Sequence, residues 1–285
     1  MKIGIAGIGL MGKALALKLA DAGFELNIYN RTSRRADEIA SEKIKVIKSP
    51  DELIQNCDSI ILILSDYNAI CDFLSSINES LKNKTIIQMG TISSGESEIL
   101  NERILVRGGD YFEAPVLGSI KQIEAKELIT LVGSNEKQFT EYKNVFEWVS
   151  KNVVRIGKVG DAAAIKLALN QLIASQTAVF AMSLGYLRNK NISTELFMQI
   201  LRESALYAPT FDKKLQNYLE RDFENPNFPL KHLLKDVRLM KGEFERAEIN
   251  TEVLKSLVSL IEDGVKNKLG EKDYSVIYDV IHPIK

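Results

Sequence analysis

Residues that often carry chemistry are scarce in this sequence, which has two cysteines, Cys57 and Cys71, and two histidines, His232 and His282. Two cysteines are too few for a disulfide scaffold, and neither lies in a run with the spacing of metal ligands. We therefore expect reduced thiols in a cytoplasmic protein, and no metal site. His282 is near the end of the sequence and His232 is expected on a helix surface, so a Ser–His–Asp hydrolase triad is poorly supported.

An excess of charge of either sign is also missing, with 37 Lys and Arg against 38 Asp and Glu and a net charge of −1. Such a balance creates no field to attract nucleic acid or an anionic membrane, so we expect neither as a partner. Met1 and Lys2 lead directly into a glycine-interrupted apolar run, which does not resemble a signal peptide. At 285 residues, 45% of them hydrophobic, the chain is long enough for two domains.

A glycine-rich turn follows the first predicted strand. Residues 2–6 form a β-type run that opens onto Gly7, Ile8, Gly9, Leu10, Met11 and Gly12, and a helical pattern then continues to Gly23. A GxGxxG motif in a βαβ unit is typical of dinucleotide binding: its first glycine allows a tight turn, its second lets backbone approach a pyrophosphate, and its third allows close packing. The helix N-terminus would face the phosphates. The alternative is a merely structural glycine turn.

The end of the second predicted strand bears on which dinucleotide is bound. NAD-binding proteins place Asp or Glu there, whereas here the residues are Asn30, Arg31 and Thr32, with no carboxylate before Asp37. An arginine can bind a 2′-phosphate that a carboxylate would repel. We therefore predict NADP rather than NAD as the cofactor, with Asn30, Arg31 and Thr32 at the site. A solvated basic helix start is the alternative.

Strands and helices alternate through the next hundred residues. Predicted strands at 44–47, 59–64 and 84–89 are separated by helical segments, and the strand at 59–64 is continuously apolar, as expected of a parallel strand covered on both faces. This alternation predicts a parallel, doubly wound α/β sheet. Leu64 and Ser65 end a strand at the carboxyl edge, where such sheets hold ligands.

Two later stretches suggest a substrate site. After the predicted strand at 111–114, backbone N–H groups at Gly118 and Ser119 could hold a substrate carboxylate. A helix predicted from Asp161 to about Leu187 is apolar or small on nearly every face, so we expect protein around it. Its polar residues argue against a membrane span. Lys166 and Asn170 lie on one face, one turn apart.

The rest of the sequence predicts helices only, at 193–202, 209–219, 230–245 and 251–267, with a short one at 273–280. A stiff loop at 225–229, with two prolines, is expected to deliver Phe228, Lys231, Lys235 and Asp236 toward whatever the long helix faces. The alternative for Lys235 and Asp236 is an exposed ion pair of little energetic value.

Four blocks resemble the β-hydroxyacid dehydrogenase family, which includes 3-hydroxyisobutyrate dehydrogenases, and most resemble its glyoxylate and succinic semialdehyde reductase branch. They are GIAGIGLMG at 4–12 with NRT at 30–32, EAPVLGS at 113–119, GDAAAIKLALN at 160–170 and FPLKHLLKDVRL at 228–239. The resemblance implies that Lys166 is the general acid/base, that Asn170 positions the substrate, and that Thr91 and Lys235 lie against the cofactor. It also implies that the loop at 116–119 grips the substrate carboxylate.

The sequence departs from the family pattern at two positions. Leu117 stands where many members have Ser, and Gly90 stands where a Ser usually precedes the Thr. The first change removes a hydroxyl from the implied carboxylate site, although the backbone donors remain. Leu117, Gly118, Ser119, Phe228 and Asp236 are therefore our substrate-binding candidates.

The chemistry of the candidates agrees with this resemblance. Reduction of a carbonyl needs a hydride on carbon and a proton on the developing alkoxide, and a lysine ammonium both donates a proton and stabilises an oxyanion. The alternative for Lys166 is a side chain that extends to the helix surface or is paired in an interface.

The combined prediction is an α/β enzyme with a Rossmann domain at 1–160 and an all-α domain at 161–285 that begins with the long connecting helix. The expected reaction is NADPH-dependent reduction of a small carboxylated aldehyde or keto acid, such as glyoxylate or succinic semialdehyde. Alternatives are a 3-hydroxyisobutyrate-type dehydrogenase running oxidatively, an imine reductase, and a catalytically silent nucleotide-binding module. The small residues of the long helix suit a homodimer or homotetramer.

Overall fold

The computed structural model describes residues 2–284 and divides into two compact units, the first ending at Lys166 and the second beginning at Leu167. The division falls inside one continuous helix, α8 (Asp161–Asn189), whose 29 residues make it roughly 43 Å long. The long helix predicted from residue 161 is therefore confirmed. The domain boundary at 160/161 stays a prediction.

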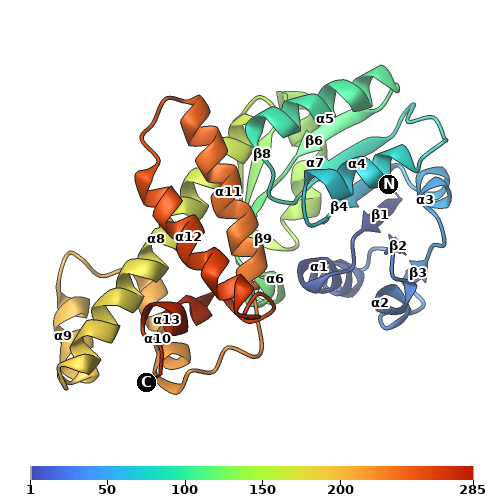
Figure 1. Cartoon of the computed structure of the whole chain (residues 1–285). Helices are drawn as coiled ribbons and strands as arrows, with labels where there is room; N and C mark the ends of the chain where they lie inside the picture. Colours follow the sequence, from blue (N-terminus) through green and yellow to red (C-terminus); the bar gives the residue numbers. More distant parts are fainter. Residues whose placement is uncertain (1, 285) are drawn as a thin grey trace. The chain divides into compact units, whose positions relative to one another are not determined.

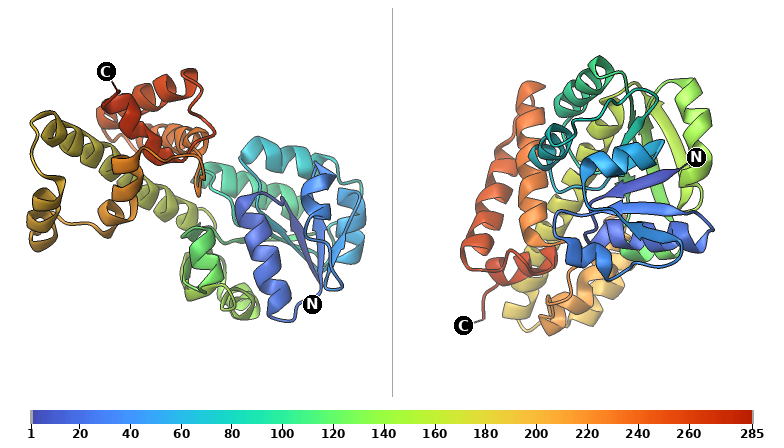
Figure 2. Two further views of the ribbon diagram at one scale, coloured as in Figure 1. Left: turned by 90° about the horizontal axis from the view of Figure 1, so that it is seen from below. Right: turned by 90° about the vertical axis from the view of Figure 1, so that its right-hand side faces the viewer.

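The first unit contains a nine-stranded sheet with helices on both faces (Figures 1 and 2). The strands are β1 (Ile3–Ala6), β2 (Leu26–Tyr29), β3 (Ile44–Val46), β4 (Ser59–Leu62), β5 (Thr85–Gln88), β6 (Asp110–Glu113), β7 (Val116–Leu117), β8 (Leu128–Gly133) and β9 (Ser150–Gly157). The helices before α8 are α1 (Leu10–Asp21), α2 (Ser33–Asp37), α3 (Pro50–Asn56), α4 (Tyr67–Ser75), α5 (Ser94–Val106), α6 (Ile120–Glu124) and α7 (Glu136–Phe146). The strand order β3-β2-β1-β4-β5-β6-β8-β7, with β9 beside β8, confirms the predicted Rossmann-type sheet.

The parallel pairing predicted for the alternating region is confirmed, and the part of the sheet after β6 differs from it. Strands β1 to β6 pair in parallel, but β8 is antiparallel to both β6 and β7, and β7 was not predicted. The reason is the connection. Helix α6 has five residues, roughly 7.5 Å, which is too short to carry the chain back along the sheet for a parallel return.

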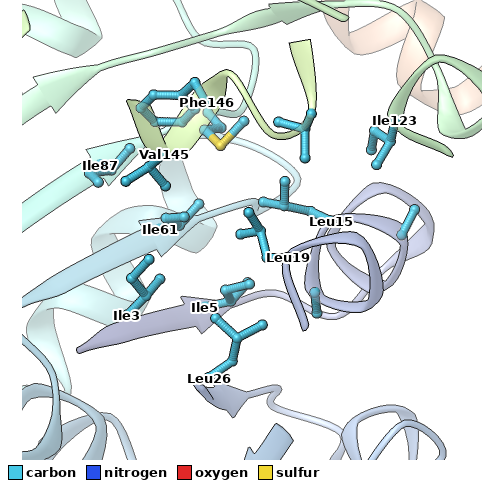
Figure 3. Packing of buried hydrophobic residues seen from close by; sticks show 14 of the residues in the cluster. Ile3, Ile5, Leu15, Leu19, Leu26, Ile61, Ile87, Ile123, Val145 and Phe146 are labelled. Carbon is cyan, nitrogen blue, oxygen red and sulfur yellow. The ribbon is translucent and has the colours of Figure 1, made fainter. Parts of the chain in front are cut away.

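Successive side chains of a strand point to opposite faces of the sheet, so the first unit has a buried cluster on each face. Ile5, Ile61, Ile87 and Phe112 are partners across four neighbouring strands, and all belong to one buried cluster, which α1 and α7 complete (Figure 3). The residues on the opposite face pack with α3, α4 and α5 in a second cluster. Burial on both faces explains why the strand sequences are continuously apolar.

The second unit is helical, as predicted. After α8 come α9 (Thr194–Glu203), α10 (Pro209–Glu220), α11 (Leu230–Arg246), α12 (Glu252–Lys266), the short 3-10 helix η1 (Tyr274–Val276) and α13 (Ile277–Ile281). Their apolar faces form one cluster with the residues of α8 from Leu167 onward. Each observed helix lies within one or two residues of its predicted range, because the caps, prolines and apolar periodicity that mark it are local signals.

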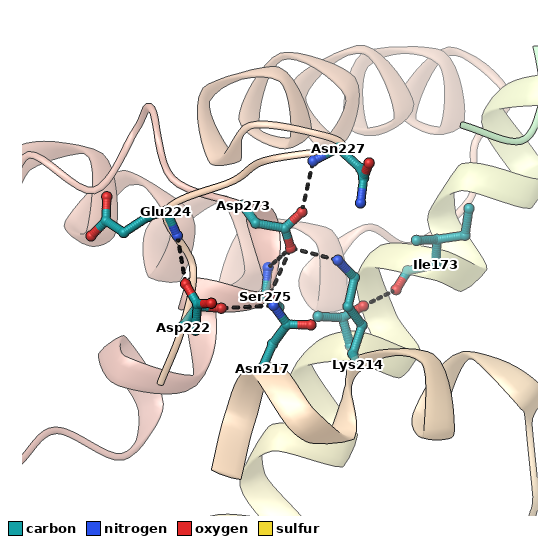
Figure 4. Close-up of polar contacts among 9 residues, drawn as sticks. Ile173, Lys214, Asn217, Asp222, Glu224, Asn227, Asp273 and Ser275 are labelled. Atoms are coloured by element: carbon teal, nitrogen blue, oxygen red, sulfur yellow. Dashed lines mark hydrogen bonds and ion pairs between the residues drawn. The ribbon is translucent and has the colours of Figure 1, made fainter. Parts of the chain in front are cut away.

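A buried polar cluster holds the loop that precedes α11 (Figure 4). Asp273 accepts hydrogen bonds from Lys214 Nζ at 2.6 Å, from the Ser275 hydroxyl at 2.6 Å and from the Asn227 N–H at 3.3 Å. The Lys214 ammonium also lies 4.4 Å from the centre of the Tyr274 ring. One carboxylate therefore joins α10, η1 and the loop that carries Phe228.

One face of the long helix is not covered by the described part of this chain itself. In α8, Leu172, Val179, Met182 and Tyr186 are exposed by 51%, 54%, 57% and 62%. By length and composition alone α8 could cross a membrane, and 44% of its most apolar window is buried. A core helix passes the same test, so this property carries no membrane assignment.

Candidate cofactor and active site

The three glycines of the loop after β1 have three different environments. Gly7 adopts φ +102°, and a Cβ there would lie 2.3 Å from the Ile63 carbonyl oxygen. A Cβ on Gly12 would lie 1.9 Å from the Gly7 carbonyl oxygen, so α1 can approach β1 only with glycine at this position. A Cβ on Gly9 would meet no heavy atom within 4 Å in the described chain beyond its own neighbours in the sequence. Gly7 and Gly12 thus serve the fold, whereas the space beside Gly9 suits a ligand.

Asn30 ties this loop to the end of β2. Its side-chain oxygen accepts a hydrogen bond from the Ile8 N–H at 2.8 Å, and its amide nitrogen donates to the Thr32 carbonyl at 2.9 Å. The Gly7 N–H donates to the Tyr29 carbonyl at 3.0 Å. The structure therefore holds the glycine loop beside Arg31 and Thr32, both of which are exposed.

The loops after β1, β4 and β5 meet at the carboxyl edge of the sheet. A Cβ on Gly7 would lie 3.0 Å from a methyl group of Leu64, and one on Gly90 would lie 2.9 Å from the Leu64 carbonyl oxygen. Leu64 and Ser65, which follow β4, and Thr91, which follows β5, are brought to the same edge as the glycine loop. The Ser65 hydroxyl donates to Asp66 at 2.7 Å.

These features fit a nicotinamide dinucleotide. Backbone N–H groups at the start of α1, open space at Gly9 and two exposed residues after β2 form a surface of the kind that binds pyrophosphate and ribose. The residues predicted for the cofactor from Gly7 to Thr91 thus lie together in the first unit. Lys235 belongs to the second unit, and its role at the cofactor stays a prediction.

In the loop predicted to bind the substrate carboxylate, the donors of Ser119 already have a hydrogen-bond partner within the chain. Gly118 adopts φ +131°, and a Cβ there would lie 2.6 Å from Leu128, so glycine is required. The Ser119 N–H and hydroxyl both donate to the Gln122 side-chain oxygen, at 2.9 and 2.6 Å. A substrate carboxylate at Ser119 would have to replace the Gln122 oxygen. The role of Leu117, Gly118 and Ser119 stays a prediction.

Sequence reasoning missed the role of Glu113, the last residue of β6. Its buried carboxylate accepts hydrogen bonds from the N–H groups of Gly160 and Ala163, at 3.0 and 3.3 Å, at the start of α8. Burial raises the pKa of Glu113 to about 7, although hydrogen bonds from Ser97 and from the α8 backbone lower it. A charged residue between the apolar Phe112 and Ala114 was the available signal.

Lys166 lies in the second turn of α8 and is largely buried. Asn170, one turn later, donates to Asp236 at 2.9 Å, and Asp236 is 2% exposed. Asp236 also lies 2.8 Å from the ammonium of Lys235. Lys235 and Asp236 are therefore not the exposed pair of the alternative interpretation. Within the second unit the structure brings Asn170, Lys235 and Asp236 together in one network.

The histidines differ from their expected surroundings. His232 was expected on a helix surface but is partly buried with its ring 6.3 Å from that of Phe228, and burial lowers its pKa. His282 packs against Gly185 and lies 3.1 Å from Asn189. Within residues 2–284, no group of three or more Cys, His, Asp or Glu side chains could hold a metal ion.

Two family matches cover almost the whole chain. Residues 2–157 match the NAD binding domain of 6-phosphogluconate dehydrogenase, and residues 160–281 match the family described as NAD-binding of NADP-dependent 3-hydroxyisobutyrate dehydrogenase. The chain belongs to the β-hydroxyacid dehydrogenase family. It is therefore an NAD(P)-dependent oxidoreductase that acts on CH–OH groups, which confirms the predicted enzyme class and a nicotinamide cofactor.

Individual members of the family and of its fold are similar over full length. Glyoxylate/succinic semialdehyde reductase 1 of Arabidopsis thaliana is 29% identical over 99% of this chain and 98% of its own. The structure of 3-hydroxyisobutyrate dehydrogenase from Salmonella typhimurium covers 98% of this chain and 99% of its own at a TM-score of 0.86, with 17% identity. A reductive aminase from Aspergillus terreus, solved with NADPH and ethyl levulinate, has 22% identity and a TM-score of 0.68, with 98% of each chain covered.

Proposed function

We propose that this β-hydroxyacid dehydrogenase uses NADPH to reduce a small carboxylated aldehyde or keto acid, glyoxylate or succinic semialdehyde, with Lys166 as the general acid. The observation that carries the proposal is the start of α8, where a largely buried lysine precedes by one turn an asparagine held by a buried aspartate. The full-length similarity to an Arabidopsis reductase named for these two substrates supports the substrate class.

The proposed step divides the work between the cofactor and the chain. When bound, the reduced nicotinamide supplies a hydride to the carbonyl carbon. The Lys166 ammonium holds the proton that the developing alkoxide needs, and its positive charge stabilises that alkoxide before transfer. Asn170 can orient the substrate without changing the charge of the site, because its amide is neutral. Its hydrogen bond to Asp236 fixes the direction of that amide.

The choice of NADPH rests on the residues after β2. Arg31 and Thr32 are exposed next to the glycine loop, and no carboxylate occurs before Asp37 to accept the ribose 2′-OH of NADH. Arg31→Ala should remove one charge-assisted interaction with the 2′-phosphate and raise the Kd for NADPH about 10- to 100-fold. The Kd for NADH should stay unchanged, and a wild-type preference for NADH would contradict the proposal.

The proposed substrate and the role of Lys166 are tested together. A panel of short aldehydes, keto acids and hydroxy acids is assayed with both cofactors, and Lys166→Ala is compared with Lys151→Ala, an exposed lysine on β9. We expect Lys166→Ala to lower kcat at least about 100-fold, as for loss of a general acid, with NADPH binding nearly intact. Retained turnover in Lys166→Ala would refute the role. Initial rates in both directions separate a reductase from a dehydrogenase that runs oxidatively.

We further propose that two copies of the chain pair through the exposed face of α8. Leu172, Val179 and Tyr186 repeat every seven residues on that face, and a heptad of apolar residues is the pattern by which one helix packs against another of the same kind. Light scattering on Val179→Glu should give a smaller assembly than the wild type. Val106→Glu, at an exposed valine of α5, is the control and should change nothing.

A further inference from the structure

Glu113 occupies a junction of the first unit. It ends β6, pairs with Gln88 of β5 on one side and with Gly133 of β8 on the other, and directly precedes the loop with Leu117, Gly118 and Ser119. Its side chain is 1% exposed. A carboxylate in the interior of a sheet is costly unless hydrogen bonds satisfy it, so its position requires an explanation.

Besides Ser97 of α5, the hydrogen-bond donors to Glu113 lie at the start of α8. Oε2 accepts from the Gly160 N–H and Oε1 from the Ala163 N–H, so the carboxylate holds both ends of the first turn of α8. The N–H groups in the first turn of a helix have no partner within the helix and carry partial positive charge, and a carboxylate satisfies both needs. These residues are 47 and 50 positions from Glu113 in the sequence.

The fold leaves room for this side chain at Gly133. A Cβ on Gly133 would lie 2.0 Å from Glu113 Oε2 and 2.8 Å from the Lys158 carbonyl oxygen. Any other residue would therefore displace the carboxylate or the strand. The missing side chain at Gly133 thus leaves the space that the Glu113 carboxylate fills. From this place the carboxylate reaches the N–H groups at the start of α8.

We propose that Glu113 is a positioning residue that holds the start of α8, and with it Lys166, at a set place relative to the loop of Leu117, Gly118 and Ser119. Lys166 follows Ala162 by four residues and Ala163 by three, so it lies one turn above the turn that Glu113 holds. A shift of that first turn would therefore move Lys166 with it. Each residue of slip would turn the lysine by about 100°. The inference rests on the proposed function of Lys166.

The substitution that isolates this role is Glu113→Gln. It keeps the shape but replaces one oxygen with an NH₂ group, which would face a backbone N–H and could not accept from it. Glu113→Asp keeps the charge and draws the carboxylate back by about one bond length. Asn135→Ala is the matched control, because Asn135 caps α7 in the same unit through hydrogen bonds with Gln138 of that helix.

We expect kcat to fall about 10- to 100-fold in Glu113→Gln, as when a catalytic group is misplaced by about 1 Å. A smaller fall is expected in Glu113→Asp, and KM and the Kd for NADPH should stay within about threefold, since no substrate or cofactor contact is removed. An unchanged kcat in Glu113→Gln, or an equal fall in Asn135→Ala, would overturn the inference. If Glu113→Gln does not fold, the kcat of Glu113→Asp is compared with that of Asn135→Ala. A lower kcat in Glu113→Asp alone would support the inference, and equal values would overturn it.

Amide hydrogen exchange separates failure of this inference from failure of the proposed function. If the wild type reduces none of the carbonyl compounds, the proposed function fails, while exchange still reports on the anchor. We expect the N–H groups of Gly160 and Ala163 to exchange at least tenfold faster in Glu113→Gln than in the wild type. Equal exchange rates would show that Glu113 does not hold this turn.

Discussion

Gly9 offers a sharp test, because it separates a glycine needed by a ligand from glycines needed by the fold. Gly9→Ala places a methyl group where the described chain, beyond the sequence neighbours of Gly9, has no heavy atom within 4 Å, and the backbone there, at φ −85° and ψ −162°, is one that alanine adopts. Loss of glycine flexibility in the unfolded chain stabilises by about 0.4–1 kcal/mol, and alanine is a poorer helix cap than glycine. The free energy of unfolding should therefore change by less than about 1 kcal/mol.

Cofactor binding should respond very differently to the same methyl group. If the pyrophosphate lies against Gly9, the methyl group displaces it from the N–H groups at the start of α1, and each charge-assisted hydrogen bond contributes about 1.5–3 kcal/mol. Loss of one or two of them, about 1.5–6 kcal/mol, predicts a Kd for NADPH raised about 10- to 10,000-fold. NADPH fluorescence titration measures the Kd, and urea unfolding without cofactor measures stability.

Two control variants complete the test. Gly12→Ala puts a methyl group 1.9 Å from the Gly7 carbonyl oxygen and should destabilise the apo protein itself. Gly242→Ala, in the interior of α11, places the methyl group at an ordinary 3.8 Å from Arg246. It should leave the Kd for NADPH unchanged and raise the free energy of unfolding by about 0.5–1 kcal/mol, because alanine is the better helix former. Unchanged NADPH binding in a folded Gly9→Ala variant would refute the placement of the pyrophosphate at this loop.

Two further predictions concern buried carboxylates. Burial raises the pKa of Glu113 to about 7, so the protonated side chain stabilises the fold relative to the ionised one. This contribution to the free energy of unfolding is complete below pH 4.5 and is lost as the pH rises through 7. Urea unfolding should therefore show a free energy of unfolding about 3 kcal/mol lower above pH 7 than below pH 4.5, and this decrease should be absent in Glu113→Gln. Asp273→Asn leaves the buried Lys214 ammonium unpaired and should lower the free energy of unfolding by about 3–5 kcal/mol, whereas the double variant Lys214→Met, Asp273→Asn should recover most of it.

Local signals in the sequence were sufficient for most of the architecture. The GxGxxG turn, the apolar strands and the capped helices depend on residues close together in the chain, so their ranges could be predicted within a few positions. Helix α10, for example, begins at the predicted Pro209 because proline fits a helix start. The same local chemistry identified the glycine loop, the residues after β2, and Lys166 and Asn170 as candidates.

Tertiary structure alone decided the contacts between distant residues. No local pattern could show that Glu113 holds the start of α8, or that Asp236 bonds Asn170 across 66 positions, because each contact depends on how whole elements pack. The antiparallel return of β8 and the exposed face of α8 have the same origin, since strand direction and burial are set by neighbours far along the chain. The sequence thus determined which side chains are available for chemistry. Tertiary packing decided which of them are fixed in place by hydrogen bonds, and which residues provide those bonds.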